Sequence, residues 1–266
     1  MIPPVGHRRG TLGAIAHWAA LVVATVLFLL PFFVLLRDGL AAGWSTVADL
    51  FTDMEIPFAR SLLNSTVVAS LQTAGQLLLC SLAGYGLARI PYRHAPKILY
   101  AVVATLMVPT AVTFVPSFVV VSSLGWLSDL RGLVVPGLFS ALNVFLFRQY
   151  FLDFPVSLEE AGRLDGLSRW GVFWRVVVPN STAFFAAIAV IDFIGSWNQF
   201  LWPLIIAQDS STWTVQVALS SLLTAQNPKI TLLFAGAAVS ILPIVLVFVL
   251  AQRYLVRGVT ETGLQG

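Results

Sequence analysis

Long apolar stretches separated by short polar segments dominate the pattern of this chain. A helix needs roughly 20 mainly apolar residues to cross the hydrocarbon core of a membrane. Six stretches are long enough, at approximately residues 13–36, 61–88, 98–123, 133–151, 182–206 and 231–254. A single stretch of this kind could be a buried helix of a soluble protein, but six in one chain are typical of a membrane protein. The pattern predicts an all-α integral membrane protein with six transmembrane helices.

Composition supports the same class. The 266 residues are 58% hydrophobic and only 10% charged, with a mean hydropathy of +0.88. Soluble domains carry charge on about a quarter of their residues, so this chain has too little polar surface to cover a water-facing globule. Cys80 is the lone cysteine, which excludes an intrachain disulfide.

The basic residues predict the orientation, because loops on the cytoplasmic side carry the excess of Lys and Arg. If both termini are cytoplasmic, the inside holds Arg8, Arg9, Arg89, Arg93, Lys97, Arg148, Arg163, Arg169, Arg175, Arg253 and Arg257. The outside then holds Arg37, Arg60, Arg131 and Lys229. We therefore expect cytoplasmic tails at 1–12 and 259–266, a transmembrane domain at 13–258, and a cytoplasmic loop between spans four and five.

Several polar side chains fall inside the apolar stretches. Gln72 and Gln76 lie four residues apart and so share one face of a helix. Asp192 is the one acidic residue well inside a span, and a carboxylate there is costly enough to be a functional candidate. Asn198 and Gln199 follow it. These five residues could line a translocation path, or they could form hydrogen bonds that hold helices together.

Several of the spans contain proline. Pro109 and Pro116 fall in the third, Pro136 in the fourth and Pro243 in the sixth. Each removes a backbone donor and can bend its helix. Such bends could serve gating or could be static.

Motifs of catalysis and cofactor binding are missing from the sequence. It has no GxxxxGK[ST] phosphate loop, no HExxH, no GxSxG and no Cys/His cluster with metal-ligand spacing. We therefore expect a non-catalytic subunit that holds no metal or cofactor and binds no nucleic acid.

Two polar segments are expected outside the membrane, at residues 37–60 and 207–230. The second opens with QDSSTWT and contains Trp213 and Gln216. Either segment could dock a soluble partner or could be a plain connector.

The cytoplasmic loop contains the most charged stretch of the chain. Ser157 and Glu160 fit a capping box, which predicts a helix from Leu158, and Asp165-Gly166 predicts the turn that ends it. Ser168 can cap a second helix that Pro179 limits. That helix should have one apolar face, which is formed by four residues at helical spacing: Trp170, Phe173, Trp174 and Val177. A small charged helix below a membrane bundle could plug into a cytoplasmic partner or lie on the membrane surface.

Residues 155–180, PVSLEEAGRLDGLSRWGVFWRVVVPN, closely resemble the EAA loop of permease subunits of binding-protein-dependent ABC importers. Glu160, Ala161, Gly166 and Pro179 match the family pattern, whereas Gly162 replaces its second alanine. The segments LLNSTVVAS, GYGLARIPY, FLFRQYF, SWNQFLWPLI and QRYLVRGVTETGLQG also resemble the sugar-type branch, specifically its shorter maltose-type permease. Gln265 stands where that family usually has lysine before the final glycine.

The resemblance implies a type I ABC importer permease fold, with its core at about 60–255 and a coupling loop at 155–179. The coupling helix would contact an ATPase dimer through Glu160, Ala161, Gly162, Arg163, Asp165 and Gly166. The resemblance also implies a second homologous permease, an extracytoplasmic solute-binding protein that docks near Trp213 and Gln216, and a location in the bacterial inner membrane. ATP would be bound by the partner subunits, and the cargo would be a carbohydrate.

Two other functions are alternatives to this one. A self-sufficient secondary transporter or channel using Asp192 would need inverted repeats and membrane-embedded coupling residues, and no clear repeat is present. A membrane enzyme would need a catalytic constellation.

Overall fold

The computed structural model describes residues 11–41, 43–53, 55–223 and 228–262, and within these ranges the chain is helical with no strand. The long elements are α1 (Thr11–Ala41), α3 (Phe58–Arg89), α5 (Thr110–Ser123), α7 (Ala141–Asp153), α11 (Thr182–Trp197) and α14 (Ile230–Thr262). Shorter α-helices are α2 (Gly43–Thr52), α4 (Ala95–Thr105), α6 (Leu130–Val134), α8 (Val156–Leu164), α9 (Arg169–Val172), α10 (Val178–Asn180), α12 (Leu201–Ile206) and α13 (Val215–Ser221). The elements η1 (Val135–Gly137) and η3 (Ser210–Thr212) are 3-10 turns, and η2 (Phe173–Val177) is a π-helix.

Helices of membrane-spanning length occur where apolar runs were expected. Three qualify by length and composition: Phe58–Arg89, Leu130–Asp153 and Ile230–Tyr254. Two bent pairs raise the number to five if each counts as one span, and the shorter apolar segment His17–Leu30 lies in the stretch expected to form the first span. Helix α14 continues to Thr262, past the expected tail boundary at residue 258, and 263–266 lie outside the described residues.

Two spans expected as continuous helices are broken instead. In the third, α4 and α5 meet at 95° across the segment that ends at Pro109. Proline lacks an N–H and disfavours helix in the residue before it, which explains a break there. In the fifth, α11 ends at Trp197 and α12 starts at Leu201. Pro203 cannot donate to the carbonyl of Gln199, which removes one helical hydrogen bond at this point and favours a break.

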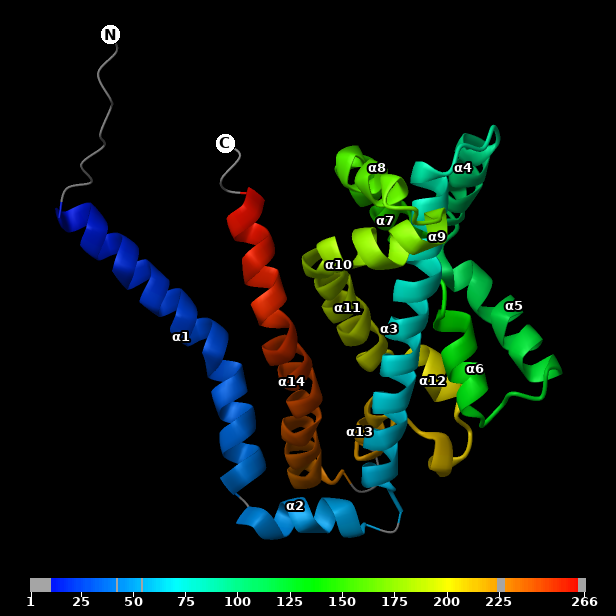
Figure 1. Ribbon diagram of the computed structural model, residues 1–266. Helices are drawn as coiled ribbons and strands as arrows, with labels where there is room; N and C mark the ends of the chain where they lie inside the picture. The colour runs from blue at the N-terminus through cyan, green and yellow to red at the C-terminus, as the bar shows by residue number, and fades with distance from the viewer. Residues whose placement is uncertain (1–10, 42, 54, 224–227, 263–266) are drawn as a thin grey trace.

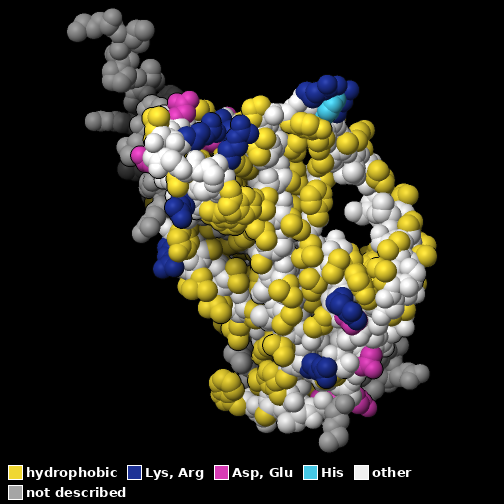
Figure 2. Space-filling model, turned by 45° about the vertical axis from the view of Figure 1, so that its right-hand side comes forward, with side chains coloured by type: hydrophobic (Ala, Val, Ile, Leu, Met, Phe, Trp, Pro, Cys, Tyr) yellow, Lys and Arg dark blue, Asp and Glu magenta, His cyan; other side chains and the backbone are white. Residues whose placement is uncertain are grey.

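The long helices run side by side, and the short helices that connect them lie partly at the two ends of the bundle (Figure 1). The first turn of α1, the last turns of α14 and the whole of α8 lie at one end, whereas α2 and α13 lie at the other. Figure 2 shows hydrophobic side chains over the middle of the visible face and most charged side chains toward the two ends. This distribution suits a protein that crosses a bilayer.

Helices α3 and α7 approach each other closely. A Cβ built at Gly84 would lie 2.6 Å from Phe147 Cβ and 2.8 Å from Arg148 N, which no real side chain could tolerate without a shift. Small residues permit this close contact between membrane helices. Beside it, one buried cluster joins Cys80 and Tyr85 of α3 to aromatic residues of α7 and of η2.

Candidate functional site

Helix α8 begins earlier than the capping-box motif predicts. Its N-cap is Pro155, so it starts at Val156 and contains Ser157, which caps nothing. Proline fixes its own φ near a value that suits helix entry, and Pro155 thereby sets the start. The predicted end is confirmed, because Asp165 is the C-cap and Gly166 takes φ +85°, a left-handed conformation that glycine adopts at low cost.

The two faces of α8 differ sharply in exposure. Glu159 and Gly162 are buried, whereas Glu160, Ala161, Arg163, Asp165 and Gly166 are exposed. Leu164 is 89% exposed, the highest value among the large hydrophobic side chains of the described residues. Five of the six residues expected to contact an ATPase therefore lie open at the end of the bundle, and the sixth, Gly162, faces inward.

Glu159 is the buried anchor of α8. Its carboxylate accepts a hydrogen bond of 3.0 Å from the Tyr85 hydroxyl, and Oε1 lies 2.9 Å from Arg89 Nε. Arg163, one turn further along α8, brings Nη2 to 3.7 Å from Oε2. The Nη2 of Arg89 also donates to the backbone carbonyl of Phe154, just before α8. The side chain of Glu159 is 2% exposed, and two cations with a hydroxyl compensate its charge.

The second half of the loop packs against the inner face of α8. Ser168 caps α9, as predicted, through a hydrogen bond from the Gly171 N–H to its hydroxyl. The expected second helix is present from Arg169 to Asn180, but its middle is the π-helix η2, which changes the spacing of the expected apolar face. Phe173 and Val177 are buried, but Trp170 is 61% exposed.

Gly162 therefore serves packing within the loop. A Cβ there would lie 3.1 Å from Val176 Cγ2 and 3.5 Å from Leu167 and Val172 side-chain atoms. The close contact at Gly162 is therefore with the chain's own second helix.

A hydrogen-bonded chain of amides joins three helices within the membrane. Asn143 Nδ2 donates to Gln76 Oε1 at 2.7 Å and lies 2.9 Å from both carboxylate oxygens of Asp192. Gln76 Nε2 in turn donates to the Gly137 carbonyl at 2.8 Å. Among the described residues, Asp192 has no cation within salt-bridge distance. The arrangement is that of hydrogen bonds between helices.

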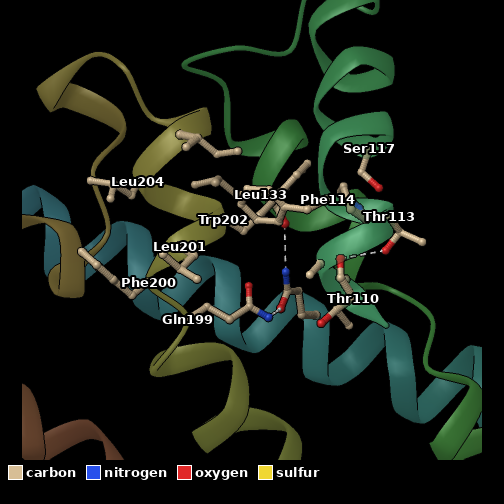
Figure 3. A pocket seen from close by; sticks show the side chains of 15 residues that line it. Thr110, Thr113, Phe114, Ser117, Leu133, Gln199, Phe200, Leu201, Trp202 and Leu204 are labelled. Carbon is tan, nitrogen blue, oxygen red and sulfur yellow. Dashed lines mark hydrogen bonds between the residues drawn. The ribbon is translucent and has the colours of Figure 1, made fainter. Parts of the chain in front are cut away.

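Gln72 has a different position, beside a cavity of about 800 Å³ between α3, α5, α6 and α12 (Figure 3). Its Nε2 donates to the Leu133 carbonyl at 2.8 Å, and its Oε1 accepts from Ser196 Oγ at 2.6 Å. Figure 3 shows side chains from α5 and from the segment that includes α12 facing each other across the cavity. Its polar and aromatic lining includes Thr110, Thr113, Phe114, Ser117, Gln199 and Trp202.

The expected path residues are thus not one group. Gln72 and Gln199 line the cavity, whereas Gln76 and Asp192 belong to the amide chain. Asn198 is exposed near the outer end and accepts a 3.2 Å hydrogen bond from Gln216 Nε2.

The outer segments are fixed to the bundle by polar contacts. Asn64 Nδ2 donates to the backbone carbonyls of Ser211 and Trp213, both at 3.0 Å. Lys229 Nζ lies 2.7 Å from Asp53 Oδ2 and 2.9 Å from Glu55 Oε2. The hydrogen bond from Lys229 holds the pKa of Asp53 below its ordinary value, and the same bond raises the pKa of Lys229.

Sequence reasoning missed Glu159, Tyr85 and Arg89 as site residues. A signal was present: Glu159 and Gly162 are three residues apart on one helical face, and Tyr85 and Arg89 are four apart on another. A cation at the end of a span and a carboxylate in a loop at the same end of the bundle can pair. The pairing itself links residues about 70 positions apart, and local pattern does not reveal it.

Residues 80–261 match the family described as "Binding-protein-dependent transport system inner membrane component". The lactose transport system permease protein LacG of Rhizobium radiobacter is 35% identical over 217 residues, 82% of this chain and 79% of that protein. The arabinooligosaccharides transport system permease protein AraQ of Bacillus subtilis is 34% identical over 76% of this chain and 72% of its own length. The sn-glycerol-3-phosphate transport system permease protein UgpE of Yersinia pestis is 35% identical over 77% and 74%.

A solved structure shares the fold. A chain of a bacterial ABC transporter involved in the import of the acidic polysaccharide alginate superposes with a TM-score of 0.80, at 21% identity, over 95% of this chain and 99% of that one. The expected all-α permease fold is thereby confirmed. On the family match and these relatives, the chain belongs to the membrane permease family of binding-protein-dependent ABC importers.

Proposed function

We propose that this chain is one of two permease subunits of an ATP-driven importer and forms half of the pathway for a carbohydrate. It lies in the bacterial inner membrane with both termini in the cytoplasm. An external binding protein delivers the solute to the outer segments, near Trp213 and Gln216. The chain itself is not catalytic, and a pair of cytoplasmic ATPase subunits binds the ATP.

The observation that carries the proposal is the construction of α8. Its inner face is held on the bundle by buried Glu159, so its outer face is presented in a fixed orientation. That outer face combines an exposed charge, Glu160, with Leu164, which is 89% exposed. An exposed apolar residue beside charged ones, on a rigid support, is typical of a docking surface for a protein partner.

The cargo class rests on the relatives and on the cavity. Two of the relatives above are named for lactose and for arabinooligosaccharides, and a third for a polyol phosphate. The cavity offers hydroxyl and amide groups from Thr110 and Gln199 beside the aromatic ring of Trp202. Sparse polar groups on a largely apolar wall suit a hydroxyl-rich solute that must bind weakly and leave.

The first test is purification of the tagged chain from its native membrane in mild detergent, followed by mass spectrometry. We expect an ABC ATPase and a second permease in the complex. Reconstituted with its binding protein, the complex should take up sugar only when ATP is supplied. A chain that purifies alone and transports in liposomes without ATP would contradict the proposal and favour a secondary transporter that uses Asp192.

The docking face has its own test. Glu160→Lys reverses an exposed charge on α8 and should release the ATPase from the purified complex. Asp153→Lys makes the same change on another exposed carboxylate, at the end of α7 and outside the docking face. Equal ATPase recovery from both variants would exclude α8 as the contact.

A further inference from the structure

We infer that Glu159, Tyr85 and Arg89 form a rigid joint that makes α3 the lever between the docked helix α8 and the membrane cavity. These three residues act through position and do not touch the solute or the ATPase. The inference rests on the proposed function, because it assumes that a partner moves α8. It adds the route by which this movement enters the membrane.

The joint holds α8 at two points. Arg89 reaches the Glu159 carboxylate through Nε at 2.9 Å, and through Nη2 it binds the Phe154 carbonyl at the entrance to α8. Tyr85 adds a 3.0 Å hydrogen bond to the same carboxylate. One guanidinium therefore fixes both a side chain of the helix and the backbone leading into it, which restricts rotation as well as translation.

Tyr85 also ties the joint into the aromatic core. Its ring lies 5.6 Å from that of Phe151 on α7 and 5.0 Å from that of Phe173 in η2, measured between centroids. These contacts place α3, α7 and η2 in one buried cluster, and the Tyr85 hydroxyl attaches α8 to it through Glu159. A close-packed cluster of this kind moves as a unit, because its side chains leave no free volume for independent adjustment.

Helix α3 is suited to carry the movement inward. It is continuous from Phe58 to Arg89 and contains no proline, whereas the neighbouring third and fifth spans are both broken. Tyr85 and Gln72 are 13 positions apart, about 20 Å along a helix at 1.5 Å per residue. Gln72 lines the cavity and binds α6 through the Leu133 carbonyl. A tilt of α3 at the joint therefore changes the cavity wall directly.

The experiment measures a distance across the cavity entrance in the assembled complex. Spin labels at Leu71 of α3 and Val112 of α5 are on exposed positions outside the cavity lining. We expect MgATP with vanadate to shift the distance between them in the otherwise unchanged complex. In Glu159→Gln we expect most of this shift to be lost, while the ATPase stays bound.

Two further variants complete the test. Tyr85→Phe removes only a hydroxyl and should give an intermediate loss of the shift. It can replace Glu159→Gln in the test if the Glu159→Gln protein does not accumulate in the membrane. Asp153→Asn neutralises an exposed carboxylate outside the joint and should retain the full shift. If Glu159 and Tyr85 had a purely structural role, the variants would lower the yield of assembled complex, but the complex that does assemble would keep the full shift.

The outcomes separate the two proposals. A full shift in both Glu159→Gln and Tyr85→Phe, with the ATPase present, overturns the joint and leaves the proposed function standing. A complex without ATPase in the unmutated protein overturns the proposed function itself. A lost shift with retained ATPase supports the joint.

Discussion

In the orientation proposed above, the cytoplasmic and outer ends of the bundle both join opposite charges, but in different surroundings. At the cytoplasmic end, Glu159 is 2% exposed and its partner Arg89 is 13% exposed. At the outer end, Lys229 is 28% exposed, and its partners Asp53 and Glu55 are 12% and 80% exposed. The first cluster is enclosed by aromatic side chains, whereas the second is open to water through Glu55.

The difference shows which ion pair fixes the structure. An exposed pair gains little, because water competes for both partners and salt screens them. A buried pair is costly to break, since removing one partner leaves the other charge without compensation. The buried charge thus lies where α8 must keep its orientation, and the more open cluster lies where two outer segments only need to stay adjacent.

The largest expected effect comes from breaking the cytoplasmic cluster. Arg89→Met leaves Glu159 buried with a hydroxyl and the more distant Arg163, and should cost about 3–5 kcal/mol in free energy of unfolding. Equilibrium unfolding of the purified chain in mixed micelles measures this change.

A double variant sharpens the result. Arg89→Met combined with Glu159→Leu removes both charges and should recover most of the lost stability. If the double variant is no more stable than Arg89→Met, the cost arises from packing and the charge argument is wrong.

Breaking the amide chain within the membrane should lower the stability by an amount between the effects at the two ends. Asn143→Leu removes the donor shared by Gln76 and Asp192, and should cost about 1–2 kcal/mol, since hydrogen bonds between membrane helices are individually modest. Asp192→Asn keeps a group that Asn143 can bind and should cost less. The same unfolding assay compares them. A larger loss in Asp192→Asn than in Asn143→Leu would show that the negative charge itself matters.

Apolar runs and turn residues predicted the helices well, because each needs only local information. The stop at Asp165-Gly166 and the cap at Ser168 follow from conformations that these residue types favour. The breaks near Pro109 and Pro203 were less visible. A proline predicts a bend or an interruption, but whether a span stays continuous depends on what packs against the freed carbonyl.

The site could be predicted as a segment but not as a set of contacts. The loop pattern identified Glu160 and its neighbours, all on the exposed face of α8 apart from Gly162. The buried partner Glu159 depends on contacts with Tyr85 and Arg89, which only the folded bundle brings together. Adjacent glutamates have opposite environments because successive residues on a helix point about 100° apart, and the sequence alone does not say which one faces the bundle.

A smaller effect is expected at Gly162, where two terms oppose each other. Alanine would gain about 1 kcal/mol of helix propensity, but its Cβ would lie 3.1 Å from Val176 Cγ2. A small movement of the Val176 side chain relieves that contact, so Gly162→Ala should stay within about 1 kcal/mol of the parent. Unfolding and sugar uptake should both be near normal. A strong loss of ATPase binding in Gly162→Ala would mean that this position contacts the partner after all.

The smallest effect should come from the outer cluster, and its pH dependence gives a distinctive test. The hydrogen bond from Lys229 lowers the pKa of Asp53, so the stability it contributes is present above the ordinary carboxyl pKa of about 4 and is lost as the pH falls through the lowered value. The raised pKa of Lys229 contributes stability that is complete below about pH 10.4 and is lost as the pH rises through the folded-state value.

The thermal midpoint of Lys229→Met should therefore differ from that of the parent by a small amount that is constant between pH 5 and 9, and the difference should shrink in stronger acid or base. Raising the salt concentration should shrink it as well, because Glu55, the second partner of Lys229, is 80% exposed. A difference as large as that of Arg89→Met, or one that grows as the pH falls, would show that the outer cluster is buried in the assembled transporter and would remove the contrast between the two ends.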